Sequence, residues 1–588
     1  MAEPSGRSGK FTIFNRWTAA LTRWRGRAAG RIAIYVAQFP GDGAVRDCLR
    51  RELPPGIAVL SAGRPVRRKE GDSLDDVSSR ADEEAGEWLR SKGGSLLVWG
   101  QPRTIDGRSL LELRFVPAAE DGDLGQELPE RRIVDPALSG SMGTSLAALA
   151  ASLAGPAGRA DRYVAGILEP LASRLAPVVA TFASLAPEDR GGILRSFAFL
   201  QLTVGTKTRD SERIEQAVAA YRQALRDITR ERSPLEWAEV QSNLGTALRR
   251  IGENENRPDC LEEAIAAHCE SLKERTRERV PLAWAVTQNN LGAALDSFAF
   301  KGGGKARAEE ALAAYREALK VWTRERGPMS WATAQYNIGS ALHRLARQGQ
   351  GTELLEQAVG AFREALKERT RRRTPQAWAE TQNNLAVTLN TLGGREEGTK
   401  RLTEAIRAFR EALKEKSRDR DPWEWARIQN NLGAALTGLG RRESGTARFR
   451  QAIVAHRAAL DEFIRERDPT QWARTQNELG VALLALGSRG DDRKPLEEAM
   501  VALRDALKER TRERAPLDWA VTKNNIGMAL FELGKREDGT ARIEEAIAAF
   551  REALEECTAD SAAHYHELCS RNLTAAEELL SARRRGEE

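Results

Sequence analysis

The sequence predicts a mostly α-helical protein, an α-solenoid of helical hairpins preceded by a small α/β domain. Tryptophan recurs every 47 residues over more than half of the 588-residue chain, a proline stands three positions before each of these tryptophans, and each repeat holds two amphipathic segments. One such unit cannot bury its apolar faces alone, so consecutive units must stack. The repeated tryptophans are Trp237, Trp284, Trp331, Trp378, Trp425, Trp472 and Trp519.

The first segment of each unit, which we call helix A, begins at this proline. With the tryptophan counted as position 0, the side chains at positions 0, 7, 11 and 14 fall on one apolar stripe. Proline suits the first helical turn, and short polar residues such as Ser233 and Asp421 stand at the N-cap before it. We expect left-handed glycines to end helix A, namely Gly252, Gly393, Gly440, Gly487 and Gly534.

The second segment, helix B, has an apolar stripe of its own, as from Leu261 to Leu272, with acidic and basic residues on the opposite side. His268 and His456 stand in this stripe where other units have Tyr or Phe. We therefore expect both histidines to be core side chains rather than bases or metal ligands.

The motif L-G-x-x-L in helix A, followed by A-x-x-x-F-x-x-A in helix B, resembles the tetratricopeptide repeat. The period of that family is about 34 residues, so the longer unit here is closer to the kinesin-light-chain type. The resemblance covers residues 190–585, including degenerate terminal repeats, and implies a right-handed solenoid. It also implies that helix A lines a concave surface that binds other proteins.

The region before the repeats divides into three parts. Residues 31–116 read as a small α/β domain of order β-α-β-α-β-β, with a helix around residues 78–92 and a hairpin turn at Asp106-Gly107. This order faintly resembles the TolB-like amino-terminal domains. Residues 117–142, rich in Gly, Pro and acidic residues, are expected to be a linker, and residues 143–189 an Ala/Leu-rich helical bridge.

Residues 1–30 form a basic segment in which Phe14, Trp17, Leu21 and Trp24 share one helical face. Such a helix could make weak contact with an anionic membrane surface through residues 11–31. The alternatives are a terminal helix packed on the next domain and a disordered tail.

The composition limits the classes of function. Lys and Arg number 91 against 85 Asp and Glu, and the two signs alternate within each helix B, whereas a nucleic-acid footprint needs one-sided clustering. The five cysteines form no C-x-x-C pair, which favours a reducing, cytoplasmic location. No apolar run is long enough to be a transmembrane helix.

The sequence offers no catalytic residue, metal site or cofactor site. The run Gly302-Gly303-Gly304-Lys305 lacks the Ser or Thr and the preceding strand of a phosphate loop. Cys557, His564, His566 and Cys569 match no zinc spacing, so we interpret this segment as a terminal cap of the array.

Two asparagine columns on the side of helix A away from the apolar stripe are the candidate site. Each amide offers a donor and an acceptor, which match the backbone of an extended peptide. The alternative is that these side chains cap neighbouring helix backbones. The column at position 6 comprises Asn243, Asn290, Asn337, Asn384, Asn431 and Asn525, and the column at position 5 comprises Asn289, Asn383, Asn430, Asn477 and Asn524.

The positions that vary between units would give this groove its preference. Position 2 makes it basic at Arg427 and Arg474, and the end near Leu484, Met528 and Phe531 is apolar. The set of Lys and Arg with which chaperone-binding tetratricopeptide proteins hold a terminal carboxylate is absent.

Two functions follow from this reading. In the first, the chain is a non-catalytic scaffold or adaptor that binds a peptide or protein partner in the groove. In the alternative, the α/β domain binds a small molecule or acts as an enzyme, and the array is its regulatory or oligomerisation arm.

Overall fold

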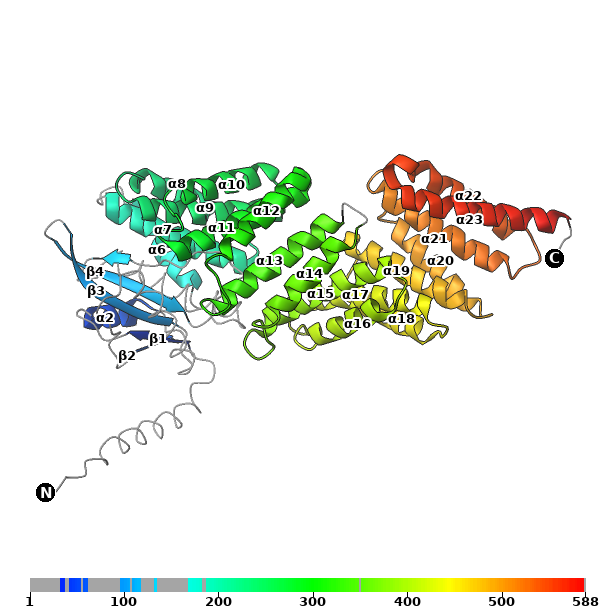
Figure 1. The fold of residues 1–588 in the computed structure, drawn as a ribbon, viewed down its shortest axis with the longest axis horizontal. Coiled ribbons are helices and arrows are strands. Elements are labelled where there is room, and N and C mark those ends of the chain that lie inside the picture. Colours follow the sequence, from blue (N-terminus) through cyan, green and yellow to red (C-terminus); the bar gives the residue numbers. More distant parts are fainter. Residues whose placement is uncertain are drawn as a thin grey trace, which may run out of the picture. The chain divides into compact units, whose positions relative to one another are not determined.

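The computed structural model describes residues 32–36, 42–53, 57–61, 96–105, 108–117, 132–134, 168–181, 187–347 and 351–585. It confirms a mostly helical chain in which a small α/β domain precedes an α-solenoid of helical hairpins (Figure 1). The chain forms two compact units, residues 1–334 and 335–588. The basic segment 1–30 and the expected helix at 78–92 lie outside the described residues.

The α/β domain contains one mixed sheet of order β2-β1-β3-β4-β5. Strand β1 is parallel to β2 and β3, while β3 and β4 pair antiparallel up to Ile105 opposite Arg108, which confirms the predicted hairpin. Strand β5 corrects the prediction of a linker at residues 117–142, because it pairs with β4 inside that segment. The elements are β1 (Ile32–Val36), α2 (Asp42–Glu52), β2 (Ile57–Ser61), β3 (Leu96–Ile105), β4 (Arg108–Pro117) and β5 (Arg132–Val134).

A continuous hydrophobic core joins this domain to the first helices of the array. Helix α6 (Glu169–Thr181) lies in the expected bridge, and α7 (Pro187–Thr208) already belongs to the first hairpin with α8 (Ser211–Asp227). Leu49 of α2, Leu171 of α6 and Leu200 of α7 are fully buried in this one cluster. The α/β domain is therefore packed against the start of the array.

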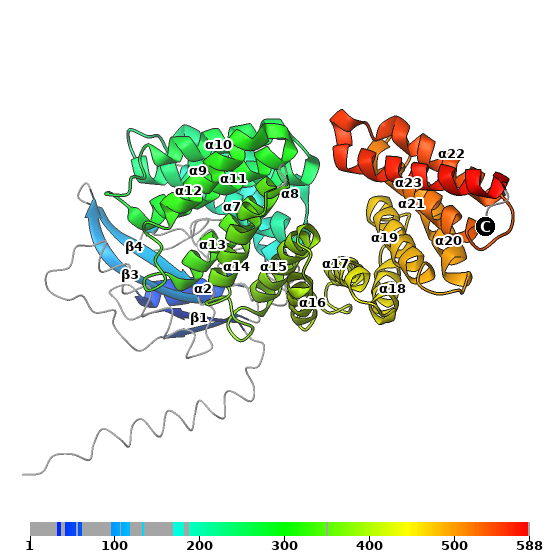
Figure 2. The same ribbon diagram turned by 45° about the vertical axis from the view of Figure 1, so that its right-hand side comes forward.

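In the array, helix A packs along the helix B that follows it. Successive hairpins stack on one another within each of the two compact units (Figure 2). The A helices after α7 are α9 (Pro234–Glu255), α11 (Pro281–Phe298), α13 (Pro328–Ala346), α15 (Pro375–Arg395), α17 (Pro422–Arg442), α19 (Pro469–Gly487), α21 (Pro516–Gly534) and α23 (Ala559–Arg585). The B helices after α8 are α10 (Pro258–Leu272), α12 (Gly304–Ala318), which follows the π-helical turn η3 (Ala299–Gly303), α14 (Glu353–Ala365), α16 (Lys400–Ala412), α18 (Ala447–Leu460), α20 (Lys494–Leu507) and α22 (Ala541–Glu556).

The predicted apolar stripe of helix A is confirmed. In α17, for example, Leu432, Leu436 and Leu439 at positions 7, 11 and 14 are buried, while Trp425 at position 0 is half-buried. The prolines occupy the first turn of the A helices, as predicted.

The glycines near the end of helix A were wrongly predicted to be left-handed. Positive φ among the described glycines is confined to Gly302 and Gly304. Gly252 and Gly440 instead lie inside helix A, where helix B approaches so closely that a Cβ atom would stand 2.6 Å from Leu261 and 2.8 Å from Phe449. These glycines are small because of packing between the two helices, and not because of backbone conformation.

An arginine stands seven positions before each tryptophan, and in several units it contacts the next hairpin. The guanidinium carbon of Arg465 lies 5.5 Å from the ring centroid of Trp472, and its Nε donates to Glu509 of the next unit at 2.6 Å. One side chain at the end of a unit thus contacts both the indole of helix A and the end of helix B in the following unit. The same arrangement occurs at Arg230, Arg371, Arg418 and Arg512.

Candidate functional site

The side of helix A that carries the asparagine columns is more deeply buried in α9 than in the A helices of residues 335–588. In α9 this side is closed, because Glu239, Asn243, Thr246 and Arg249 at positions 2, 6, 9 and 12 are all less than 10% exposed. Asn290 of α11 is also buried. Two residues of the predicted position 6 column therefore lie beneath the surface of residues 1–334.

The same side stays partly open in residues 335–588. Positions 2, 6 and 9 of α15, α17, α19 and α21 are half-buried, except for Arg474, which is exposed. We call these twelve positions the A face. The A helices that carry it contact one another in the order α15, α17, α19 and α21. The A face has its own composition at position 9, where the residues are small or flexible and apolar: Val387, Ala434, Val481 and Met528.

The position 5 asparagines lie deeper than the position 6 asparagines. Asn289, Asn383, Asn430, Asn477 and Asn524 are all less than 10% exposed, whereas Asn337, Asn384, Asn431 and Asn525 are half-buried. Position 5 lies about 100° around the helix from position 6 and points between neighbouring units. Of the two columns, only the position 6 column contributes to the A face.

Hydrogen bonds between the two columns join consecutive units. The position 6 amide of one unit donates to the position 5 side chain of the unit before: Asn384 to the Tyr336 hydroxyl at 2.8 Å, Asn525 to Asn477 Oδ1 at 3.1 Å, and Asn572 of α23 to Asn524 Oδ1 at 2.9 Å. We call this set the amide ladder. It bonds side chain to side chain, which differs from the helix-capping alternative that the sequence left open.

The ladder is interrupted at Asn431, where Asn383 Oδ1 of the preceding unit has no hydrogen-bond partner, and at Glu478. Glu478 occupies position 6 of α19 but has no N–H to offer to Asn430 of the preceding unit. Asn430 Oδ1 instead pairs with His456 Nδ1 of its own helix B at 2.8 Å.

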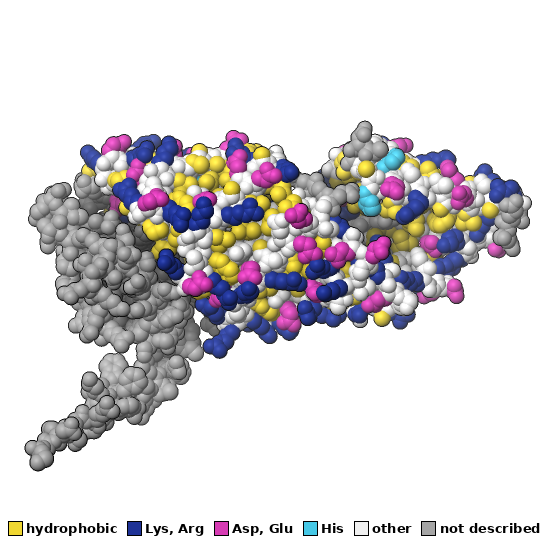
Figure 3. Space-filling model, viewed as in Figure 1, with side chains coloured by type: hydrophobic (Ala, Val, Ile, Leu, Met, Phe, Trp, Pro, Cys, Tyr) yellow, Lys and Arg dark blue, Asp and Glu magenta, His cyan; other side chains and the backbone are white. Residues whose placement is uncertain are grey.

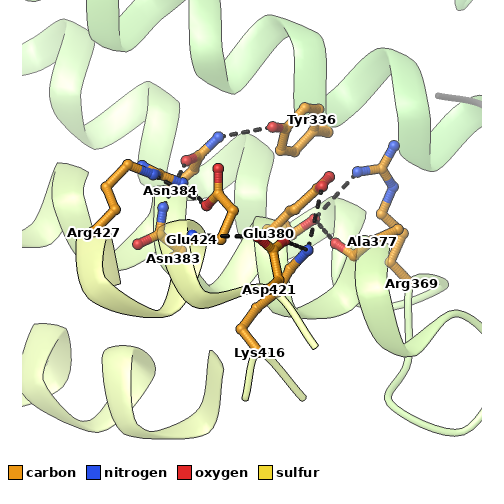
Figure 4. A network of polar contacts seen from close by, with 11 residues as sticks. Tyr336, Arg369, Ala377, Glu380, Asn383, Asn384, Lys416, Asp421, Glu424 and Arg427 are labelled. Carbon is orange, nitrogen blue, oxygen red and sulfur yellow. Dashed lines mark hydrogen bonds and ion pairs between the residues drawn. The ribbon is translucent and has the colours of Figure 1, made fainter. Parts of the chain in front are cut away.

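Figure 4 shows the surroundings of the ladder between α13, α15 and α17. Arg369, which is 3% exposed, lies with its guanidinium carbon 4.5 Å from the Tyr336 ring centroid and donates to Thr381 Oγ1 at 3.3 Å. Lys416 Nζ lies 3.6 Å from Asp421 and 3.9 Å from Glu380. The junction between helix B and the next helix A therefore carries cations that point at helix A.

The two basic residues predicted for the groove are not equivalent. Arg427 donates to Glu424 at 2.6 Å and lies over the Trp423 ring at 6.0 Å, so much of its charge is balanced within α17. Arg474 is exposed and makes no hydrogen bond or ion pair with another described residue. Arg474 is thus the more exposed of the two cations on the A face.

The histidines confirm their prediction as core side chains. His268 and His456 are completely buried, and desolvation lowers the pKa of each to about 3. Burial also lowers the pKa of His343, at position 12 of α13, to about 4.

The described residues contain no cluster of His, Cys, Asp and Glu suited to a metal ion, and their cysteines are all free thiols. No described helix is both long enough and apolar enough to cross a membrane. Basic and acidic side chains alternate over the visible face of the array (Figure 3). The side chains of the α/β domain lie mostly outside the described residues, so a small-molecule or enzymatic role for that domain stays a prediction.

The amide ladder predicts a measurable difference between two Asn→Ala substitutions. Asn477→Ala removes the oxygen that accepts from Asn525 Nδ2 and from Thr522 Oγ1 at 3.2 Å, and should lower the free energy of unfolding by about 1–2 kcal/mol. Asn431→Ala gains the same helix propensity, but Asn431 makes no hydrogen bond within the described chain, so the change should stay within about 0.5 kcal/mol. Urea unfolding of both variants measures the difference, and equal values would remove the ladder as a stabilising feature.

Comparisons with known proteins concern the array. Residues 425–464, which span most of α17 and all of α18, match the family model described as tetratricopeptide repeat. No curated protein sequence matches the chain. The match lies outside residues 31–116, so the TolB-like resemblance stays a prediction.

Solved structures similar to this chain share little sequence with it. Yeast Tom70 is 12% identical, with 71% of this chain and 93% of that chain covered and a TM-score of 0.30. The apo form of RapI is 12% identical, with 65% and 96% covered and a TM-score of 0.36. The TPR2AB domain of yeast Sti1, in a complex with pHSP90, is 20% identical, with 50% and 98% covered and a TM-score of 0.18.

Proposed function

Because residues 425–464 match the tetratricopeptide repeat and the other units share their sequence pattern, the array is built of tetratricopeptide repeats, and we propose that it is a protein-interaction scaffold. Its ligand is an extended peptide segment of a partner protein, bound along the A face of residues 335–588. The observation that carries the proposal is that positions 2, 6 and 9 are partly exposed in α15, α17, α19 and α21. The same positions are buried in α9.

The geometry of an extended peptide fits this surface. Packed helices lie about 8–10 Å apart, and a strand rises about 3.3 Å per residue, so successive A helices meet every third peptide residue or so. The ladder amides of the A face are Asn384 and Asn525, and each donates one N–H to the preceding unit. The second N–H and an acceptor lone pair of each amide can bind a peptide group. Recognition of the peptide backbone gives affinity with little dependence on sequence.

The side-chain preference comes from positions 9 and 2. The row of Val387, Ala434, Val481 and Met528 offers shallow apolar contacts to the peptide side chains that lie against these residues. Arg474 favours an acidic peptide residue near α19, and Glu478 disfavours a second acidic residue beside it. The preferred segment is therefore apolar and extended, with a single acidic residue.

Two valine substitutions test this proposal, one on the A face of α19 and one on the exposed side of α18. Val481→Arg places a long cation in the middle of the A face and should weaken peptide binding at least about tenfold, because it removes an apolar contact and blocks the backbone path. Val454→Arg changes a valine of α18 that is 68% exposed on helix B, and should leave binding unchanged. The full chain is screened against an array of unstructured peptides, and affinities are measured for the best peptide.

Two outcomes would contradict the proposal. One is a peptide whose affinity falls with Val454→Arg and not with Val481→Arg, which would place binding on helix B. The other is equal binding by the unchanged chain and Val481→Arg, with both proteins folded by circular dichroism.

A further inference from the structure

Two positions of the repeat meet, in several units, at the junction between helix B and the next helix A. They lie nine residues before and three residues after the tryptophan, and we call them the junction pair. In three units the pair is Arg and Thr in direct contact: Arg275 Nη1 to Thr287 Oγ1 at 3.4 Å, and 3.3 Å for both Arg369 to Thr381 and Arg510 to Thr522. The repeat thus brings the two side chains of this pair together.

In the last described unit both members of the junction pair are cysteine. His566 of α23 occupies the tryptophan position, so Cys557 and Cys569 stand nine residues before and three residues after it. They are 0% and 1% exposed, lie in one hydrophobic cluster with Ala520 and Ala553, and each thiol is close enough to the other to affect its pKa. Both are free thiols in this structure.

The last junction also lacks the arginine that joins earlier units. Seven residues before His566 stands Ala559, where the earlier junctions have an arginine that contacts both the indole and the end of helix B in the following unit. Among the described helices, α23 packs mainly against α22 and α21. Helix α23 is held by the buried pair, by the ladder bond from Asn572 to Asn524, and by peripheral bonds such as Arg551 to Glu577 at 2.7 Å.

We propose that Cys557 and Cys569 form a reversible disulfide that locks the terminal helix α23 onto α22. With a peroxide as oxidant, one thiol becomes a sulfenic acid and releases water; the sulfur of the second thiol then attacks it, forms the S–S bond and releases a second water. Two thiols are oxidised, and one peroxide is reduced to two molecules of water. A dithiol reductant reverses the reaction by exchange.

Opening of α23 controls when the reaction occurs. Burial raises the pKa of both thiols, that of Cys569 to about 12, so the packed pair contains little thiolate. A terminal helix opens more readily than an internal one, and opening admits both peroxide and water. Once formed, the disulfide holds α23 in its closed position against α22.

The test uses the full chain and a variant that restores the pair of the internal units. The protein is treated with hydrogen peroxide, denatured, alkylated and mapped by mass spectrometry. We expect a Cys557–Cys569 linkage within one chain and alkylated Cys48 and Cys260. Hydrogen exchange in α23 should slow on the order of a hundredfold in the oxidised protein and recover with dithiothreitol.

The double variant Cys557→Arg with Cys569→Thr keeps the junction filled and should show no change in exchange after peroxide. Three results would overturn the proposal: oxidation confined to the exposed Cys269, a disulfide that joins two chains, and unchanged exchange in α23 despite a formed linkage. If the double variant proves unfolded, Cys569→Ala alone serves as the comparison.

Discussion

Replacing Gly527 with valine should destabilise the array by about 3 kcal/mol, at the upper end of the cost of overpacking a core. Gly527 lies at position 8 of α21, where a Cβ atom would stand 2.6 Å from Phe550 Cε1 and 2.8 Å from its Cδ1. Phe550 is fully buried, so its ring has no free space to move into. The added side chain must therefore push α21 and α22 apart.

Gly360 provides the matched control. It lies inside α14, but a Cβ atom added there meets nothing within 4 Å. Gly360→Val should change the free energy of unfolding by less than about 0.5 kcal/mol, since valine and glycine differ little in helix propensity. Urea unfolding followed by circular dichroism measures both variants, and hydrogen exchange should place the loss of Gly527→Val in α21 and α22. Equal effects at the two positions would refute the packing explanation.

The same glycine contacts show which parts of the fold the sequence could predict. Helical periodicity correctly identified the stripe at positions 7, 11 and 14, because burial on one side of a helix depends on neighbouring residues of the same segment. A glycine near a helix end, such as Gly440, looks the same in sequence whether it is needed for a left-handed turn or for close contact. Only the position of helix B distinguishes the two cases, because it places Phe449 2.8 Å from where a Cβ atom on Gly440 would stand.

Prediction of the candidate site from the sequence was limited in a similar way. The sequence placed both asparagine columns away from the apolar stripe, but the structure buries the position 5 side chains and leaves only the position 6 side chains of residues 335–588 half-buried. Which of the two columns the next unit covers depends on the offset between units. The bond from Asn525 to Asn477 fixes this offset, and no local pattern contains it. The burial of positions 2, 6, 9 and 12 in α9 could not be predicted from the sequence either, because it results from tertiary packing within residues 1–334.

The buried histidines make stability depend on pH in a direction that can be tested. In the unfolded chain a histidine has a pKa of about 6.5, whereas desolvation lowers the pKa of His268 to about 3 in the folded protein. Below pH 6.5 the unfolded chain therefore binds a proton that the native state cannot accept. The stability contributed by neutral His268 is complete above that pH and is lost progressively as the pH falls toward about 3.

Substitution by the residue of other units isolates this contribution. Phenylalanine fills the same position at Phe362 and Phe409, and neither ring nitrogen of His268 has a hydrogen-bond partner in the structure. Between pH 7 and pH 5 the unchanged protein should lose about 2 kcal/mol more than His268→Phe, which corresponds to one proton bound by the unfolded chain below its pKa. Carboxylates contribute equally to both proteins and cancel in the difference.

The measurement is the urea midpoint of both proteins at several pH values, with His564→Asn as a control at an exposed histidine of α23. His564→Asn should follow the unchanged protein at every pH. His268→Phe should in addition be more stable at pH 7, because it removes two buried nitrogens without partners. If the unchanged protein and His268→Phe instead lose stability in parallel below pH 6.5, His268 must take up a proton in the native state, and the closed packing of its ring against Gly245 could not persist in acid.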